Sequence, residues 1–175
     1  MGISVGSSPD GRTGVIVIGY THEIPEETSA AVLGFPHVLA NVSGGDAFYF
    51  NLLASWWAST EPDILVIEHD IVVDEAAIKE LLDCPYPWCP AWYPFEGGEI
   101  YGLGCTKFSL PIRQAVPDAF DKIGAIDQSP IHPPKHWCSL DAWLQGVLMT
   151  AGQQPHPHRA NVRHLGALRS HLACR

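Results

Sequence analysis

Three titratable residues, Glu68, His69 and Asp70, interrupt the apolar run LVIEHDIVV at residues 65–73. A run of this kind predicts a buried strand, and buried strands seldom hold three such side chains. Because strand side chains alternate between faces, we expect Glu68 and Asp70 on one face and His69, packed or hydrogen-bonded, on the other. Two buried carboxylates repel each other unless a cation lies beside them, so the pattern indicates a divalent ion or a metal-bound diphosphate. The alternative is a strand that ends near Ile67 and leaves both acids in solvent.

The segment HPHRANVRH at residues 156–164 offers further candidate ligands. In an extended segment His156 and His158 lie on the same side, and His164 follows nearby. Carboxylate together with neutral imidazole suits Mn²⁺ better than the all-oxygen sites that Mg²⁺ prefers. A proline-flanked histidine pair is also typical of a surface loop, so the residues alone do not choose among the three.

The cysteines Cys84, Cys89, Cys105, Cys138 and Cys174 form no CxxC pair. We interpret them as reduced thiols of an intracellular protein. A structural zinc site that uses Cys84 and Cys89 is the alternative, but their spacing is poor for zinc and no second pair follows.

The chain of 175 residues is 46% hydrophobic and 17% charged, which predicts one globular domain. It contains no apolar run of about 18 residues, and residues 1–13 predict a short leader and not a signal peptide, so we expect a cytoplasmic protein without a membrane span. The net charge of −9 argues against a general nucleic-acid binder. No acid follows Asp141, however, and a basic tail that suits an anionic partner is formed by Arg159, Arg163, Arg169 and Arg175.

The first half of the chain alternates predicted strands and helices. Strands are expected at residues 14–20, 37–42 and 65–73, and helices at residues 23–35, 43–60 and 74–83. Ser43 or Asp46 is the candidate cap of the second helix, and Asp74 is that of the third. This alternation predicts an α/β fold, a Rossmann-like, open, mostly parallel sheet with helices on both faces, in a single domain.

The second half is less regular. Residues 84–104 are rich in proline, glycine and aromatic residues and predict irregular strands and loops, whose rings could stack on a sugar or nucleobase or simply cover the sheet. A helix with an internal proline is expected at residues 110–123, and a longer one starts at Ser139 as its cap and ends at Gly152. The tail after it has no strong pattern.

The order of these features resembles that of the GT-A glycosyltransferases, which use nucleotide sugars and join a Rossmann-like half to an acceptor half. ILVIEHDIVV resembles the acidic DxD element, with Glu68 and Asp70 in its two acidic places, and GLGCTKFSLPIRQAVPDAF resembles the segment that follows. WCSLDAWLQGVLMTAG resembles the later helix whose N-terminal acid is the catalytic base of inverting members, and Asp141 takes that place. VRHLG resembles the C-terminal histidine that closes the metal site, which favours His164 ahead of His158.

The resemblance covers residues 14–166 and implies a nucleotide-binding half at 14–83 followed by an acceptor half. Asp70 and His164 would hold a divalent cation, Mn²⁺ or Mg²⁺, on the diphosphate of a nucleotide sugar, with a UDP-sugar as the expected donor. Glu68 would act directly, through water or on the ribose.

The resemblance also implies contacts to the nucleotide. Tyr20 and Thr21 would contact its base and ribose, and Arg163 or Arg159 would pair with a phosphate. The acid that the class often carries after its second strand is missing from LANVSGG, so Asn41 or Ser43 would have to replace it.

The implied activity is an inverting, metal-dependent glycosyl transfer to an acceptor hydroxyl. Compact members of this kind resemble those of phage genomes, so a hydroxymethylated DNA base in a host cytoplasm is one candidate acceptor beside glycan, protein and small-molecule hydroxyls. The alternatives are a nucleotidyltransferase, although GYTHEIPEE lacks the expected Gly-rich basic loop, and a phosphohydrolase, which needs more clustered ligands for two metals. A non-catalytic module that binds sugar nucleotides is the third.

Overall fold

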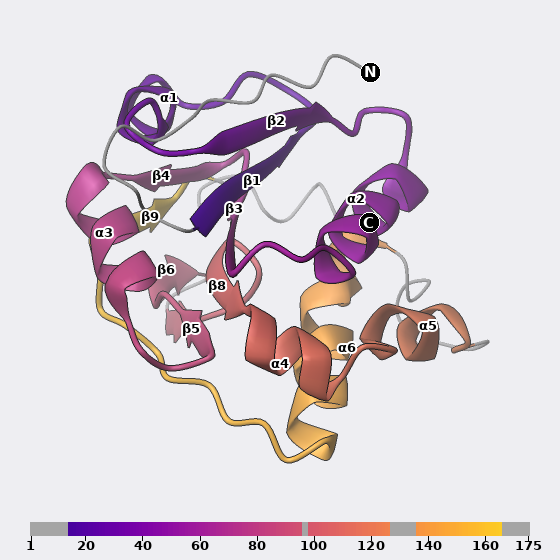
Figure 1. The fold of residues 1–175 in the computed structure, drawn as a ribbon. Coiled ribbons are helices and arrows are strands. Elements are labelled where there is room, and N and C mark those ends of the chain that lie inside the picture. The colour runs from indigo at the N-terminus through magenta and orange to yellow at the C-terminus, as the bar shows by residue number, and fades with distance from the viewer. Residues whose placement is uncertain (1–13, 96–97, 127–135, 166–175) are drawn as a thin grey trace.

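A five-stranded sheet forms the centre of the computed structural model, which describes residues 14–95, 98–126 and 136–165 (Figure 1). Its strands lie in the order β2 (His37–Asn41), β1 (Gly14–Tyr20), β3 (Asp63–Glu68), β8 (Cys105–Ser109) and β5 (Trp88–Pro90). β1 pairs in parallel with β2 and β3, whereas β8 is antiparallel to β3 and β5. All strands except β8 therefore run in one direction, which confirms the predicted mostly parallel sheet.

Helices cover both faces of the sheet, as predicted (Figure 1). One face carries α1 (Glu26–Val32) and α3 (Glu75–Asp83), and the other carries α2 (Asp46–Trp57), α4 (Leu110–Ala115), α5 (Ala119–Gly124) and α6 (Trp137–Thr150). β3 contributes to both cores, because Leu65 and Ile67 pack in the first and Ile64 and Val66 in the second. A strand that is apolar on both faces is typical of a parallel sheet covered by helices. Among the described residues, no helix has the length and hydrophobicity that a membrane span requires.

Two small sheets bring the C-terminal segment back to the middle of the chain. β4 (Ile71–Val73) pairs antiparallel with β9 (Val162–His164), and β6 (Tyr93–Phe95) pairs with β7 (Gly98–Ile100). Just before β9, the amide of His158 donates to the carbonyl of Pro90 in β5 (2.8 Å). The tail, for which the sequence predicted no element, is therefore held at two places by distant strands.

The run at residues 65–73 is not one strand, and that prediction was wrong. β3 ends at Glu68, His69 and Asp70 form a turn, and β4 starts at Ile71. β4 diverges from the central sheet because it pairs with β9. The apolar run continues across the turn since all three residues of β4 are buried as well.

Three N-terminal helix caps were predicted, and one of them, Asp74, is correct. Asp74 caps α3 by accepting a hydrogen bond from the amide of Ala77 (2.8 Å). The N-cap of α2 is Gly45 and not Ser43 or Asp46, and no side chain caps this helix. With φ at 122°, the backbone of that position suits glycine, which has no Cβ to clash.

The helices of the second half also differ from those predicted. The single helix expected at residues 110–123 is two helices, because Pro117 has no amide hydrogen to donate and disfavours helical backbone at the residue before it. α6 begins at Trp137, so Ser139 lies inside the helix and does not cap it. Gly152 follows its end with φ at 80°, as a helix-terminating glycine does.

A buried arginine fixes the chain between α2 and β3. Arg113 of α4 is 2% exposed, and its guanidinium donates to the carbonyls of Trp56 (3.0 Å), Ser59 (2.8 Å) and Glu61. Carbonyls at the end of a helix have no partner within it. Arg113 therefore satisfies the end of α2 and fixes the approach to β3.

Candidate functional site

The carboxyl ends of β1 and β3 lie side by side, at the edge where open α/β sheets bind ligands. The register places Gly19 next to Glu68. Tyr49 of α2 donates its hydroxyl hydrogen to Glu68 Oε1 (3.0 Å). A Cβ at Gly19 would lie 2.8 Å from the Tyr49 ring, so glycine leaves the space that this ring occupies. The Glu68 carboxylate is therefore held by one fixed donor.

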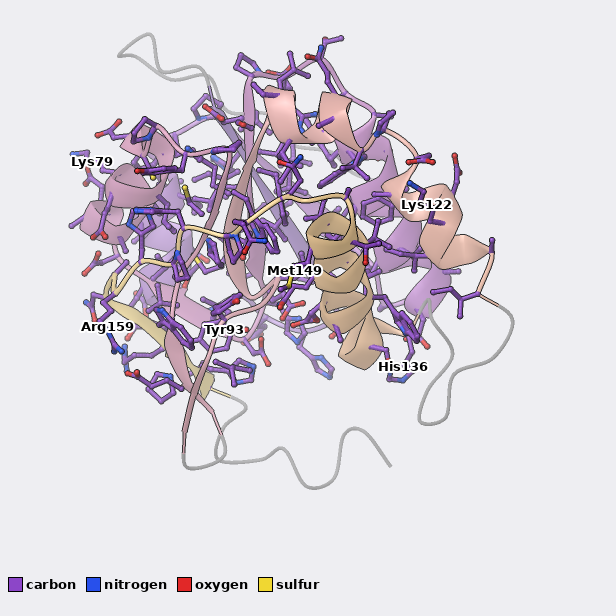
Figure 2. The ribbon with its side chains drawn as sticks, turned by 90° about the horizontal axis from the view of Figure 1, so that it is seen from below. Lys79, Tyr93, Lys122, His136, Met149 and Arg159 are labelled. Atoms are coloured by element: carbon purple, nitrogen blue, oxygen red, sulfur yellow. The ribbon has the colours of Figure 1, made fainter. Side chains whose placement is uncertain are left out.

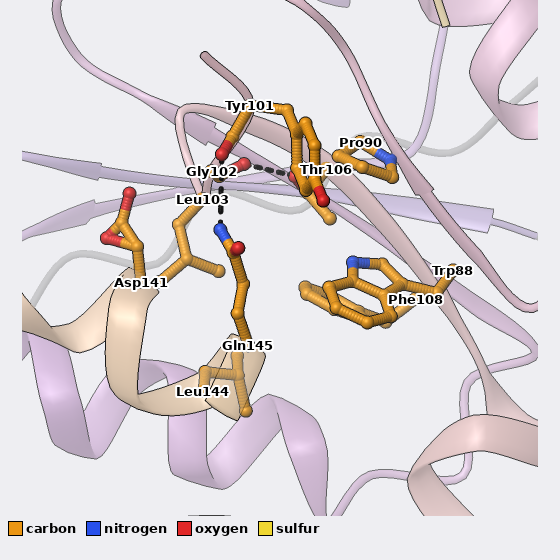
Figure 3. Close-up of a pocket in the computed structure, with 10 residues that line it drawn as sticks. All are labelled: Trp88, Pro90, Tyr101, Gly102, Leu103, Thr106, Phe108, Asp141, Leu144 and Gln145. Atoms are coloured by element: carbon orange, nitrogen blue, oxygen red, sulfur yellow. Dashed lines mark hydrogen bonds between the residues drawn. The ribbon is translucent and has the colours of Figure 1, made fainter. Parts of the chain in front are cut away.

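Asp141 reaches the same region from α6 (Figure 3). Its carboxylate lies against the backbone of Gly102, where an added Cβ would overlap Asp141 Oδ2. The amide of Leu103 donates to this carboxylate. Gln145, one turn further along α6, donates to the carbonyl of Tyr101 (3.1 Å). α6 therefore fixes both the acid and the loop that the acid faces.

Two carboxyl groups at this edge, those of Glu68 and Asp141, have raised pKa values. Burial raises the pKa of Glu68 well above its ordinary value, and the charges of Asp141 and Asp70 raise it further. Burial raises the pKa of Asp141 to about 6, although two backbone amides oppose the shift. The pKa values of Tyr49 and Tyr93 are raised first by burial and then by the charge of Glu68. Three carboxylates in one partly buried site carry excess negative charge, which a bound cation would offset.

β9 supplies the histidine of the site. His164 pairs with Ile71 in the β4–β9 ladder, and its Nε2 lies 3.4 Å from Asp70 Oδ2. The His164 ring stacks on Tyr93 with 5.6 Å between the centroids. The amide of Leu165 also donates to the carbonyl of Asp70 (2.8 Å). Two atoms that each lie about 2.1 Å from a shared cation are about 3.0 to 3.4 Å apart, so this pair fits one divalent ion.

The turn after β3 contacts the end of β1. His69 Nε2 lies 3.4 Å from Thr21 Oγ1, and the His69 ring stacks on His22 with 5.9 Å between the centroids. Burial lowers the pKa of His69, while the charge of Asp70 raises it. His69 is hydrogen-bonded, as predicted, but it projects from a turn and not from the opposite face of a strand.

The end of β2 lies beside the end of β1, where Tyr20 pairs with Asn41. Asn41 Oδ1 accepts hydrogen bonds from the amide (2.9 Å) and the hydroxyl (2.6 Å) of Ser43. Asn41 also lines a cavity of about 540 Å³ between β2 and α2, together with Phe48 and Trp56. The structure thus places Tyr20 and Asn41, two of the residues predicted to contact the nucleotide, at one edge of the sheet.

His158 was predicted as an alternative metal ligand beside Asp70. The structure places it elsewhere, since His158 Nδ1 lies 2.8 Å from Glu80 Oε1 of α3. The histidine that lies next to Asp70 is His164, at the end of β9. Of the two histidines, His164 is therefore the one that lies beside Asp70 in the structure.

The two arginines predicted to bind phosphate do not lie beside Asp70 or Asp141. Arg163 is the middle residue of β9, so its side chain lies opposite to that of His164 and reaches Glu27 of α1 (3.5 Å). Arg159 pairs with Glu99 (2.7 Å) and lies at the periphery of the molecule (Figure 2). Neither arginine contacts Asp70 or Asp141 in this structure.

Sequence reasoning did not select Tyr49, and it considered Tyr93 only as one ring of an aromatic segment. Tyr49 belongs to the apolar stripe of α2, and a tyrosine in such a stripe indicates core packing. Tyr93 lies in the aromatic segment that was expected to stack on a ligand or to cover the sheet, and it is 3% exposed. The close approach of Gly102 to Asp141 could likewise not be predicted from the sequence, because it depends on how the loop and α6 pack together.

No model of a known protein family matches the chain. No curated protein matches it by sequence. A solved glycosyltransferase involved in the glycosylation of the major capsid of PBCV-1 aligns with a TM-score of 0.51 and 12% identity, over 87% of this chain and 93% of that one.

Two other solved structures align less well. They are A197 from STIV (TM-score 0.48, 8% identity, 84% of this chain and 82% of that one) and a Bacillus anthracis protein assigned as a glucose-1-phosphate thymidylyltransferase, in complex with sucrose (0.48, 10%, 90% and 92%). The alignment with the PBCV-1 capsid glycosyltransferase shows that the chain shares its overall fold with a glycosyltransferase, as the order of its motifs led us to expect.

Proposed function

We propose that the protein is a metal-dependent glycosyltransferase that moves a sugar from a nucleotide-diphosphate sugar to an acceptor hydroxyl. The observation that carries this proposal is the convergence of Glu68, Asp70, Asp141 and His164 at the carboxyl edge of the parallel strands. These residues come from β3, the turn after it, α6 and β9, so the fold assembles them from distant parts of the chain. The fold shared with a glycosyltransferase supports the proposal.

Asp70 and His164 would hold the divalent cation, and Mn²⁺ suits them because one ligand is an imidazole nitrogen. When bound, the cation would offset the charge that develops on the departing nucleoside diphosphate. Thr21 and Asn41, at the ends of neighbouring strands, would contact the nucleotide, which we expect to be UDP. Glu68 would bind the ribose or a water molecule of the cation.

Asp141 would accept the proton of the acceptor hydroxyl. A pKa of about 6 suits this role, since the carboxylate is mostly ionised at neutral pH and yet more basic than an ordinary aspartate. The bond from the anomeric carbon to the acceptor oxygen forms as the bond to the diphosphate oxygen breaks. The proton passes to Asp141, the nucleoside diphosphate leaves, and the anomeric centre is inverted.

Thermal unfolding with a panel of nucleoside diphosphates, with and without Mn²⁺, tests the binding step. A ligand at about 100 times its Kd stabilises a protein by about 2.7 kcal/mol, which raises the Tm of a chain of this size by about 5 to 10 °C. We expect a shift of this size for one base, only with Mn²⁺. Asp70→Asn should abolish the shift, and Asp121→Asn, an exposed aspartate of α5, should keep it. If no nucleotide raises the Tm of the wild type, the proposal is wrong.

Turnover with the matching nucleotide sugar tests the reaction. The acceptors should include glycans, peptides, small-molecule alcohols and duplex DNA with hydroxymethylated bases. Release of the nucleoside diphosphate with glycosylation of an acceptor would support the proposal, and Asp141→Asn should abolish this release while nucleotide binding persists. Release of pyrophosphate or inorganic phosphate would instead assign a nucleotidyltransferase or a phosphohydrolase, and binding without turnover would assign a binding module.

A further inference from the structure

A second group of metal-ligating side chains lies beside β5, the outer strand of the central sheet. Cys84 follows the end of α3, and Cys89 is the middle residue of β5. His156 and His158 belong to the segment between α6 and β9. One donor atom from each of these four residues lies within 4.8 Å of all the others. Two distant parts of the chain therefore bring two thiols and two imidazoles together.

The separations between these atoms fit a tetrahedral ion. Cys84 Sγ lies 3.7 Å from His156 Nδ1, and His156 Nδ1 lies 3.3 Å from His158 Nε2. With metal–sulfur bonds of about 2.3 Å and metal–nitrogen bonds of about 2.0 to 2.1 Å, a tetrahedral zinc site has sulfur–nitrogen edges of about 3.6 Å and nitrogen–nitrogen edges of about 3.3 Å. The two observed separations agree with these edges.

Glu80 orients one of the histidines. Its Oε1 lies 2.8 Å from His158 Nδ1, which leaves His158 Nε2 facing the other donors. A carboxylate on the outer nitrogen fixes the tautomer of a histidine and is the common partner of zinc-bound imidazole. The second histidine is held by packing, because the His156 ring stacks on Tyr86 with 4.0 Å between the centroids and 13° between the planes.

Backbone hydrogen bonds fix the histidine pair against β5. The amide of His156 donates to the carbonyl of Trp88, and the amide of His158 donates to that of Pro90, both at 2.8 Å. The carbonyl of His158 accepts from the amide of Trp92 at the same distance. Alternate residues of an extended segment point to one side, so His156 and His158 present their rings together. The sheet therefore determines where both rings lie.

We propose that Cys84, Cys89, His156 and His158 bind one structural Zn²⁺ ion. Two thiolates and two neutral imidazoles select zinc over cations that prefer oxygen, and four protein ligands leave no position open for catalysis. Two thiolates also neutralise the charge of Zn²⁺. Lys107, which is buried and donates to the carbonyl of Cys84, places a positive charge beside this group of side chains. The ion would tie the tail to α3 and β5, and this proposal does not depend on the glycosyltransferase activity.

Metal content tests the proposal. Untagged protein, purified without chelator under reducing conditions, should contain about one zinc per chain when measured by inductively coupled plasma mass spectrometry. Cys89→Ser and His156→Ala should lose the zinc. Cys105→Ser, at a buried cysteine of β8, and His37→Ala, at a histidine whose Nδ1 bonds the carbonyl of Phe35, should keep it. Zinc that is retained in both Cys89→Ser and His156→Ala would overturn the assignment.

Two further measurements decide the matter if those variants fail to fold. Wild-type protein exchanged with Co²⁺ should show the intense visible bands of tetrahedral cobalt together with thiolate charge transfer, whereas folded protein that binds neither zinc nor Co²⁺ would refute the site. Glu80→Gln alters an exposed residue and keeps all four ligands. Chelator competition should show about 10- to 100-fold weaker zinc binding for this variant, and an unchanged affinity would contradict the role of Glu80.

Discussion

Replacement of Asp141 by asparagine should abolish catalysis and stabilise the folded protein at neutral pH. Burial raises the pKa of this carboxyl group from 3.8 to about 6. The folded state therefore holds the proton more tightly than the unfolded chain by about two pKa units, each worth about 1.4 kcal/mol. The stability that comes from this proton is present at low pH and is lost as the pH rises through 4 to about 6. Above that range the ionised group costs about 3 kcal/mol, and a neutral amide of the same shape avoids this cost.

Urea unfolding of wild type and Asp141→Asn, in buffer without Mn²⁺ or nucleotide, measures this effect. The two proteins should have similar stability near pH 4, and the variant should be more stable by about 1 to 3 kcal/mol near pH 7.5. Asp121→Asn, the control at an exposed position of α5, should not differ from wild type in stability by a pH-dependent amount of this kind. If Asp141→Asn is no more stable than wild type at pH 7.5, the argument that this carboxylate is held at an energetic cost is refuted.

Three further predictions follow from the packing and charges of the site. Gly102→Ala should displace the Asp141 carboxylate and reduce kcat about 100-fold, while nucleotide binding is preserved. Gly146→Ala is the control and should leave kcat unchanged, because a Cβ added there meets nothing within 4 Å. Arg113→Met should lower the free energy of unfolding by about 3 kcal/mol in urea, because buried carbonyls lose their donor, while the exposed Lys122→Met should change it by less than about 0.5 kcal/mol. The kcat of the wild type should rise with pH through about 6, as Asp141 becomes an ionised base, and a kcat that falls across this range would exclude that role.

The sheet and its covering helices could be predicted because their signals are local. The apolar run at residues 14–20 is β1 at the predicted bounds, and Asp74 caps α3 because its carboxylate needs only the amide three residues later. The break at Pro117 was misjudged as a helix interior, although the same local rule, the missing amide hydrogen, explains it. Errors of this kind shift a boundary by a few residues and leave the fold unchanged.

The site was harder to predict because its ligands depend on pairing between distant strands. His158 and His164 both lie in extended parts of one short tail, and only the resemblance of VRHLG to a family motif favoured His164. β9 pairs with β4 and brings His164 to Asp70, whereas the segment before it pairs with β5 and brings His158 to Glu80. The partner strands therefore decide which group of side chains each histidine lies beside.

The same argument explains why Cys84 and Cys89 looked unsuitable for zinc. A search for a second pair at short spacing misses His156, whose separation from Cys84 is 72 residues along the chain and 3.7 Å in space. Short spacing matters in small zinc folds because the ion must organise a chain with little other structure. Here α3 and β5 are already placed by the hydrophobic core, so the ligands can come from anywhere that the sheet brings together. In a domain of this size, candidate metal sites have to be sought among strand neighbours as well as among sequence neighbours.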